Sequence, residues 1–258
     1  MSIDNISTEG MNIEDAVKLI RGKRGTKVKL EILRGSKSFF KILSREKIEI
    51  KSVSSKVNQT KNGLLIGYVR IKQFNANASK ETKDAIKDLE KRKVAGYVLD
   101  LRSNPGGLLE SSIDISRHFI NKGVIVSTVS KDGLKETKRG NGQALTKKPL
   151  VVLVNEGSAS ASEIVSGAIK DNKRGKLVGK KTFGKGLVQS MRTLVDGSGL
   201  TVTVAKYLTP NGTDINKSGI IPDIEVKMNI NPILQRAVSY THLRAHETDS
   251  YLVFRLMR

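Results

Sequence analysis

The sequence predicts an α/β protein, with a core of parallel and mixed strands joined by crossover helices and a smaller unit before it. The first observation is an alternation of apolar strand-like runs with helical segments from Val94 onward, which is typical of parallel strands with crossover helices. The second is size: 258 residues with 38% hydrophobic content suffice for one large domain, alone or with a small one.

The first 45 residues predict a small unit. NIEDAVKLIRG has the apolar spacing of an amphipathic helix, with Asn12 as its N-cap. TKVKLEILRG and SKSFFKILSRE follow as two strands around Gly35. We expect no strand in MSIDNIS for them to pair with, and therefore expect that Met1 is not the native start.

The larger unit is expected to begin its first strand near Gly63. Helices are predicted in SKETKDAIKDLEKRK, in LLESSIDISRHFI after the turn NPGG, and after a run of serines. A polar loop is expected before PLVVLV. The predicted strands, in chain order, are LLIGYVRIKQF, VAGYVLDLR, VIVSTVS, PLVVLV, GKLVGK, LVQSMRTLV and LTVTVAKYL.

Composition excludes several classes of function. The chain has no cysteine, which excludes disulfides, zinc thiolate sites and cysteine nucleophiles. A net charge of +21 would suit nucleic acid, but the lysines are spread along the chain and only 4% of residues are aromatic. We therefore expect a solvated basic surface and no nucleic-acid partner. No apolar run approaches the roughly 18 residues of a membrane span, and no leader opens the sequence.

A candidate nucleophile lies in GSASASEIVSGAIKD, where three serines alternate at the start of a predicted helix. Taken alone, this stretch favours helix capping by Ser158 or Ser160 over catalysis. A histidine base is not expected, because the chain has only three histidines. His118 fits an ordinary helix position, and the other two, His242 and His246, lie in a compositionally odd tail. The question is then whether a lysine can act as the base.

A candidate base lies in GKKTFGKGLVQS. Extended backbone would place Lys185, Leu187 and Gln189 on one face, so that Gln189 could orient the lysine amine. The segment nearly spells a phosphate-binding loop, but Gly186 stands where the loop needs Ser or Thr, and we therefore discount nucleotide binding. The turn LDLRSNPGGLL offers Gly106 and its neighbour as oxyanion donors, or is a plain Pro-Gly turn.

Several of these motifs together resemble the carboxy-terminal processing proteases, PDZ-containing serine peptidases with a Ser/Lys dyad. The resemblance runs from about residue 3 to 238 and is carried by IDNISTEGMNIEDAVKLIRGKRGTKVKLEILR, GYVRIKQF, LDLRSNPGGLL, VVLVNEGSASASEI, GKKTFGKGLVQ and GTDINKSGIIPDIEV. It implies a crotonase-like protease core of mixed and parallel strands with crossover helices, preceded by a truncated PDZ domain. The implied domains are a partial PDZ domain at 1–45, a peptidase core at 46–238 and a tail at 239–258.

The resemblance also implies roles for single residues. Ser160 would be the nucleophile and Lys185, 25 positions later, the base, with Gln189 orienting it. The backbone amides of Gly106 and Ala161 would hold the oxyanion. Two acidic residues on the serine helix, Glu163 and Asp171, would support the geometry of the site.

The implied function is a serine endopeptidase that cleaves proteins near the carboxyl terminus through an acyl-enzyme, without metal or cofactor. Its partners would be polypeptides recognised by their C-terminal tails. The family works outside the cytoplasm, in the periplasm, cell envelope or thylakoid lumen, and the resemblance allows peripheral membrane association of the intact protein. The alternative is a catalytically silent scaffold that binds peptides with the same fold.

Two departures from the family stand out. The sequence begins after the point where the resemblance would place the family's leader, its N-terminal helices and the first part of the PDZ domain, with the loop expected to hold a substrate carboxylate; we therefore expect this chain to be a fragment. The last twenty residues, 239–258, match nothing in the family, and we expect them to be adapter or vector sequence without function.

Overall fold

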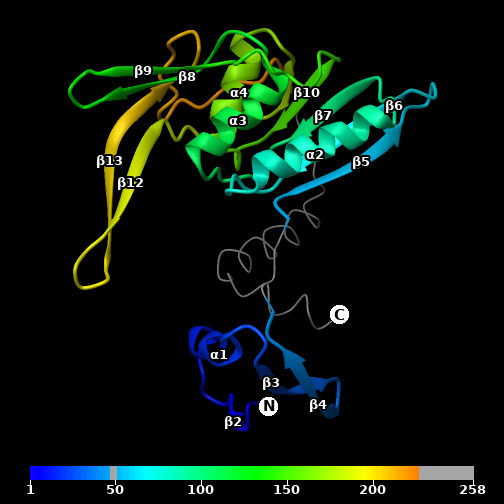
Figure 1. Ribbon diagram of the computed structural model, residues 1–258, viewed down its shortest axis with the longest axis vertical. Coiled ribbons are helices and arrows are strands. Elements are labelled where there is room, and N and C mark those ends of the chain that lie inside the picture. Colours follow the sequence, from blue (N-terminus) through cyan, green and yellow to red (C-terminus); the bar gives the residue numbers. More distant parts are fainter. Residues whose placement is uncertain (47–50, 227–258) are drawn as a thin grey trace. The chain divides into compact units, whose positions relative to one another are not determined.

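The computed structural model describes residues 1–46 and 51–226, which form two compact units divided between these two ranges (Figure 1). The predicted tail at 239–258, with His242 and His246, lies outside the described residues.

The smaller unit contains the predicted helix and strand pair. The side chain of Asn12 caps the helix by accepting the N–H of Asp15 at 2.9 Å, as predicted. The expectation that MSIDNIS holds no strand is wrong, because Ile3 pairs with Leu30 in an antiparallel sheet of order β2-β1-β3-β4. Strands of two residues are too short to show a periodic pattern. The elements are β1 (Ser2–Ile3), β2 (Ile6–Ser7), α1 (Ile13–Ile20), β3 (Lys27–Arg34) and β4 (Lys37–Ser44).

The larger unit is built on a six-stranded sheet of order β14-β11-β10-β7-β6-β5. All neighbouring strands are parallel except β5, which runs antiparallel to β6. The alternation of strands and helices therefore predicted the parallel core correctly. The strands are β5 (Val53–Gln59), β6 (Leu65–Ile71), β7 (Gly96–Asp100), β10 (Leu150–Val154), β11 (Lys176–Gly179) and β14 (Ile224–Glu225).

Three helices pack side by side on this sheet: α2 (Ala78–Lys91), α3 (Leu109–Phe119) and α4 (Ala161–Asp171) (Figure 1). Burial alternates along β10 and, from Gly67 onward, along β6, with every second residue buried, as expected where helices cover one face. Among the described residues, no helix is long and apolar enough to cross a membrane.

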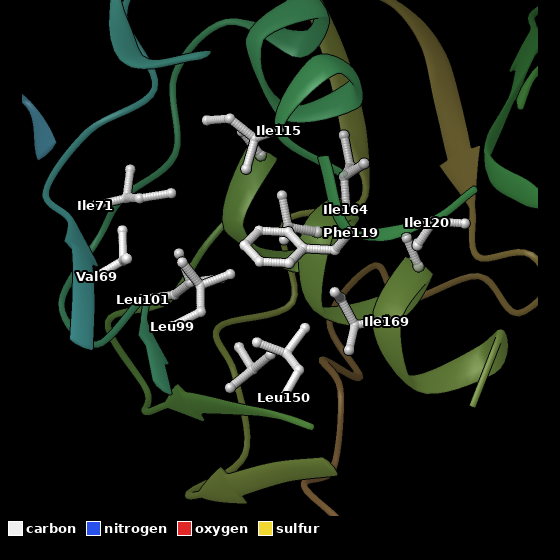
Figure 2. Close-up of a cluster of buried hydrophobic side chains, with 14 of the residues drawn as sticks. Val69, Ile71, Leu99, Leu101, Ile115, Phe119, Ile120, Leu150, Ile164 and Ile169 are labelled. Atoms are coloured by element: carbon white, nitrogen blue, oxygen red, sulfur yellow. The ribbon is translucent and has the colours of Figure 1, made fainter. Parts of the chain in front are cut away.

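The main hydrophobic core lies between the sheet and these helices. Figure 2 shows aliphatic side chains from β6 and β7 grouped around Phe119 of α3, which is 2% exposed. Ile164 and Ile169 of α4 belong to the same cluster. Burial of these apolar side chains anchors α4, and with it the serine segment, to the carboxyl ends of the parallel strands.

A second sheet of four antiparallel strands has the order β12-β13-β8-β9. VIVSTVS, expected among the parallel strands, instead forms β8 of this sheet and pairs with β13. The loop expected after it contains β9, whose sequence KETKR has no apolar residue to mark a strand. Figure 1 shows the β12–β13 hairpin extending as an arm away from the helices. The bounds are β8 (Val124–Ser130), β9 (Lys135–Arg139), β12 (Leu187–Thr193) and β13 (Gly199–Leu208).

Candidate active site

Ser160 lies between the end of β10 and the first residue of α4, with a backbone conformation that is rare for serine. Its φ is 54° and its ψ is −113°. A non-glycine residue at positive φ carries strain, and such strain concentrates at functional sites. Nucleophilic serines of hydrolases occupy comparable sharp turns between a strand and a helix, which expose the hydroxyl.

The two neighbouring serines have structural partners. The Ser158 hydroxyl donates to the carbonyl of Leu101 at 2.8 Å, and the Ser162 hydroxyl donates to the carbonyl of Asn104 at 2.9 Å. Both side chains are fully buried. Ser158 therefore does not cap α4, whereas Ser160 is the N-cap residue of this helix, as the alternative prediction had it. Ser160 is half-buried and lines a pocket.

The glycine turn after β7 lies directly against the serine turn. The carbonyl of Asn104 accepts the N–H of Ala159 at 3.0 Å. A Cβ added to Gly106 would lie 2.8 Å from the Cβ of Ser160 and 3.0 Å from the nitrogen of Ala161. The structure thus brings together the two residues predicted as oxyanion donors, Gly106 and Ala161. The Gly106 N–H is donated to the Asn104 side chain at 2.9 Å, so an oxyanion would have to replace that partner.

Glu163 connects the serine segment to the lysine segment. Its carboxylate is fully buried and accepts four hydrogen bonds. Oε2 accepts the N–H of Ser160 at 2.8 Å and of Lys185 at 2.9 Å. Oε1 accepts the Thr182 hydroxyl at 2.6 Å and the Gly184 N–H at 2.7 Å. One side chain therefore fixes the backbone of the predicted nucleophile relative to that of the predicted base.

These hydrogen bonds also settle the resemblance to a phosphate-binding loop. In such loops the backbone N–H groups point at the phosphates of a nucleotide. Here the amides of Gly184 and Lys185 are both donated to Glu163. The segment therefore binds a carboxylate of its own chain.

One pocket of about 370 Å³ brings the predicted site residues together. The pocket is lined by Ser160, Ala161, Lys185 and Gln189. Gly106 is not among the lining residues, but its neighbour Gly107 is. The other lining residues are mainly apolar: Leu108, Leu109, Ile164, Leu187, Val188, Thr201 and Tyr207.

Strict alternation does not hold along the lysine strand. Leu187, Val188 and Gln189 are consecutive, yet all three line the pocket. A register shift lies at this point: Val188 pairs with Ala205 but Gln189 pairs with Thr203, which leaves one residue of β13 unpaired. Lys185 and Gln189 line the same pocket, which is compatible with the prediction that they share one face. The bulge beside Gln189 was not predicted from the sequence.

Tyr207 is a site residue that sequence reasoning missed. It lies on β13, is 3% exposed, lines the pocket and donates its hydroxyl to the carbonyl of Lys185. Burial raises the pKa of Tyr207 well above its usual range, and the charge of Glu163 adds to this; a hydrogen bond with Ser160 acts in the opposite direction. The signal available in the sequence was a single tyrosine in the otherwise polar and aliphatic run VTVAKYL.

Asp100 and Arg102 form a second group that the sequence analysis did not single out. Asp100 is fully buried and accepts Arg102 side-chain N–H groups at 2.7 and 2.9 Å and the Tyr68 hydroxyl at 2.5 Å. Burial alone would raise the pKa of Asp100, but the hydrogen bonds from Arg102 and Tyr68 lower it overall. The group fixes the end of β7, from which the glycine turn begins. In the sequence, the only indication of this group was the pair of charged residues in the otherwise apolar run VAGYVLDLR.

The remaining candidates lie elsewhere. Asp171, at the end of α4, accepts the N–H of Asn211 at 3.0 Å. His118 contacts the carbonyl of Ser79 at 3.0 Å through its ring, which agrees with an ordinary helix position. Among the described residues, no group of three or more His, Asp or Glu side chains is arranged to hold a metal ion.

A serine at positive φ and a lysine line one pocket beside a parallel sheet, which places the chain among the α/β proteins and is the arrangement expected of a serine hydrolase. Residues 65–226 match peptidase family S41, and the chain belongs to this family.

The chain is similar to the carboxyl-terminal-processing protease of Synechocystis sp., with 48% identity over 86% of this chain and 53% of the relative. It is 42% identical to the carboxy-terminal processing protease CtpA of Bacillus subtilis, over 88% of this chain and 48% of the relative. A solved photosystem II D1 C-terminal processing protease superposes with a TM-score of 0.64 at 37% identity, over 88% of this chain and 62% of that one. The chain thus spans about half the length of the curated relatives it matches.

Proposed function

We propose that this chain carries the peptidase core of a carboxyl-terminal processing serine endopeptidase, with a crotonase-like fold preceded by part of a PDZ domain. It cleaves polypeptides near their carboxyl terminus. The observation that carries the proposal is the shared Oε2 of Glu163, which binds the backbone of Ser160 at 2.8 Å and of Lys185 at 2.9 Å beside one pocket.

In the proposed reaction, Ser160 Oγ attacks the carbonyl carbon of the scissile peptide bond while the neutral amine of Lys185 takes its proton. Gln189 orients that amine. The N–H groups of Ala161 and Gly106 stabilise the oxyanion, with Gly106 exchanging its Asn104 partner for it. The C–N bond then breaks, and the lysine returns the proton to the leaving amine. Water, deprotonated by the same lysine, hydrolyses the acyl-enzyme and restores Ser160.

The pocket also supports a class of substrate. Ile164, Leu109 and Leu187 contribute an apolar lining beside Ser160 and suit an apolar side chain next to the scissile bond. In the intact protein, the PDZ domain would select the substrate by its C-terminal tail. The relatives include a chloroplastic carboxyl-terminal-processing peptidase of Arabidopsis thaliana as well as bacterial proteases, which supports work outside the cytoplasm.

The test uses the purified 258-residue chain and four variants: Ser160→Ala, Lys185→Ala, Lys185→Arg and Gln189→Ala. A fluorophosphonate probe reports reactive serine, and a peptide with an apolar residue at the cleavage site reports turnover. Wild type should be labelled and should cleave, with a rate that rises with pH and is unaffected by EDTA. The serine variant should be unlabelled, and the arginine variant should be as inactive as the alanine variant because guanidinium keeps its proton.

Three outcomes would overturn parts of the proposal. Unlabelled wild type that still binds the peptide would favour a silent peptide-binding scaffold. Substantial turnover by Lys185→Arg would remove the lysine as base. Loss of wild-type activity in EDTA would point to a metal-dependent mechanism.

A further inference from the structure

The backbone around Lys185 is held on both sides of the residue. Its N–H is donated to Glu163 of α4 at 2.9 Å, and its carbonyl accepts the hydroxyl of Tyr207 on β13. The Gly186 carbonyl accepts the N–H of the same tyrosine at 3.0 Å. The two peptide planes that flank the Lys185 Cα are therefore fixed by two different elements of the fold.

This clamp has a physical reason in the local sequence. Lys185 stands between Gly184, which has a φ of 92°, and Gly186. Glycine leaves the backbone dihedrals free, so two flanking glycines would by themselves leave the direction of the lysine side chain poorly defined. Neither position has room for a side chain. A Cβ added to Gly184 would lie 2.9 Å from the nitrogen of Gly219, and a Cβ added to Gly186 would lie 2.7 Å from the nitrogen of Asn216. The rigidity of the lysine must therefore come from hydrogen bonds to its backbone.

Tyr207 is suited to be a permanent donor in this clamp. Its side chain is 3% exposed, and the raised pKa that burial and Glu163 impose keeps its hydroxyl protonated throughout the neutral and mildly alkaline range. Its proton goes to the Lys185 carbonyl, and Tyr207 lines the same pocket as Ser160. The hydroxyl thus holds the lysine backbone beside the pocket that contains the predicted nucleophile.

We propose that Tyr207 is a positioning residue for the lysine base: its hydroxyl holds the Lys185 carbonyl and so aims the lysine side chain at Ser160. The inference rests on the proposed function, in which Lys185 accepts the serine proton. Glu163 fixes one side of the lysine and Tyr207 fixes the other. Misplacement of a reacting group by about 1 Å can cost on the order of a hundredfold in rate, so the loss of one hydroxyl should be visible in catalysis.

The test compares Tyr207→Phe with Tyr97→Phe in the full chain. Tyr97 is a matched control, because it is also 3% exposed and its hydroxyl also makes a hydrogen bond, to Glu90 at 2.8 Å, away from the pocket. Both variants delete one buried phenolic hydroxyl. Three readouts are taken: kcat and KM with one peptide, the pH profile of acylation by the fluorophosphonate probe, and hydrogen exchange of the peptide covering 182–189.

We expect Tyr207→Phe to lower kcat by about 10- to 100-fold with KM changed by less than about twofold. The rate of acylation by the probe should fall at every pH of the profile, because a misplaced lysine accepts the serine proton less effectively. Exchange at 182–189 should increase. Tyr97→Phe should show none of these changes, although both variants lose similar thermal stability.

Equal effects of the two variants on kcat, pH profile and exchange would overturn the inference while leaving the proposed function intact. Faster exchange at 182–189 with unchanged kcat and pH profile would also overturn it, since the clamp would then not aim the base. A wild type without labelling or cleavage would instead overturn the proposed function, and exchange at 182–189 would still decide whether the clamp exists.

Discussion

The carboxylate of Glu163 accepts the backbone N–H of Lys185 at 2.9 Å, across 22 residues of sequence. All four groups that bind this carboxylate are donors, two at each oxygen. An uncharged amide of the same shape cannot replace it, because its NH₂ group would face two of these donors.

Glu163→Gln is therefore expected to destabilise the protein by about 2 to 4 kcal/mol and to lower fluorophosphonate labelling of Ser160 at least tenfold. Urea unfolding and labelling rates measure the two effects. Glu156→Gln is the control: Glu156 is 67% exposed and pairs with Lys180 at 3.2 Å, so its change should stay within about 0.5 kcal/mol. Similar unfolding free energies for the two variants would contradict the central role of Glu163.

Ser160→Gly is expected to be inactive yet more stable than wild type by about 1 kcal/mol. Glycine removes the strain of φ 54° and ψ −113°, a gain of about 1 to 3 kcal/mol, which exceeds its entropic cost in the unfolded chain. Ser160→Ala should be inactive without this gain, because alanine keeps the strained conformation. Unfolding free energies from urea titration, together with labelling, provide the comparison. A glycine variant no more stable than the alanine variant would show that the turn stores no strain.

Gly106→Ala should lose both activity and stability. Gly106 has a φ of 103°, and its added Cβ would lie 2.8 Å from the Cβ of Ser160 and from the carbonyl oxygen of Ala159. Gly133→Ala is the control, since Gly133 has a φ of 80° but open space around it, so it carries only the left-handed cost of about 1 to 2 kcal/mol. Peptide turnover and thermal unfolding of both variants measure the difference. Turnover retained in Gly106→Ala would argue against close contact of the two turns.

The stability of the protein should fall in mildly acidic solution partly through His118. Burial lowers the pKa of His118 below 6.5, and the carbonyl of Ser79 opposes this only in part. The unfolded chain then binds the extra proton first, so the contribution of His118 is present above about pH 6.5 and is lost as the pH falls below it. His118→Gln does not titrate and should show a shallower loss of unfolding free energy between pH 7.5 and 5. Parallel curves for wild type and variant would refute this assignment.

The sequence alone determined the elements whose signal is local. Buried strands such as PLVVLV, the cap at Asn12 and the parallel core follow from apolar runs and turn residues near one another in the chain. The same holds for the segments that carry Ser160 and Lys185, because glycines and small residues mark turns between strands and helices. The assignment of roles to Ser160, Lys185, Gln189, Gly106 and Ala161 came from resemblance to the family and stays a prediction until the variants are measured.

Only the tertiary structure decided how these segments meet. The sheet to which VIVSTVS belongs depends on its pairing with β13, which lies some eighty residues later and leaves no periodic signal in β8 itself. The bulge beside Gln189 arises from the register between two strands and not from either strand alone. The clamp on Lys185 joins it to Glu163 and Tyr207, each 22 residues away. These contacts join residues that are far apart in the sequence and become neighbours only when the chain folds, so no local pattern of residues predicts them.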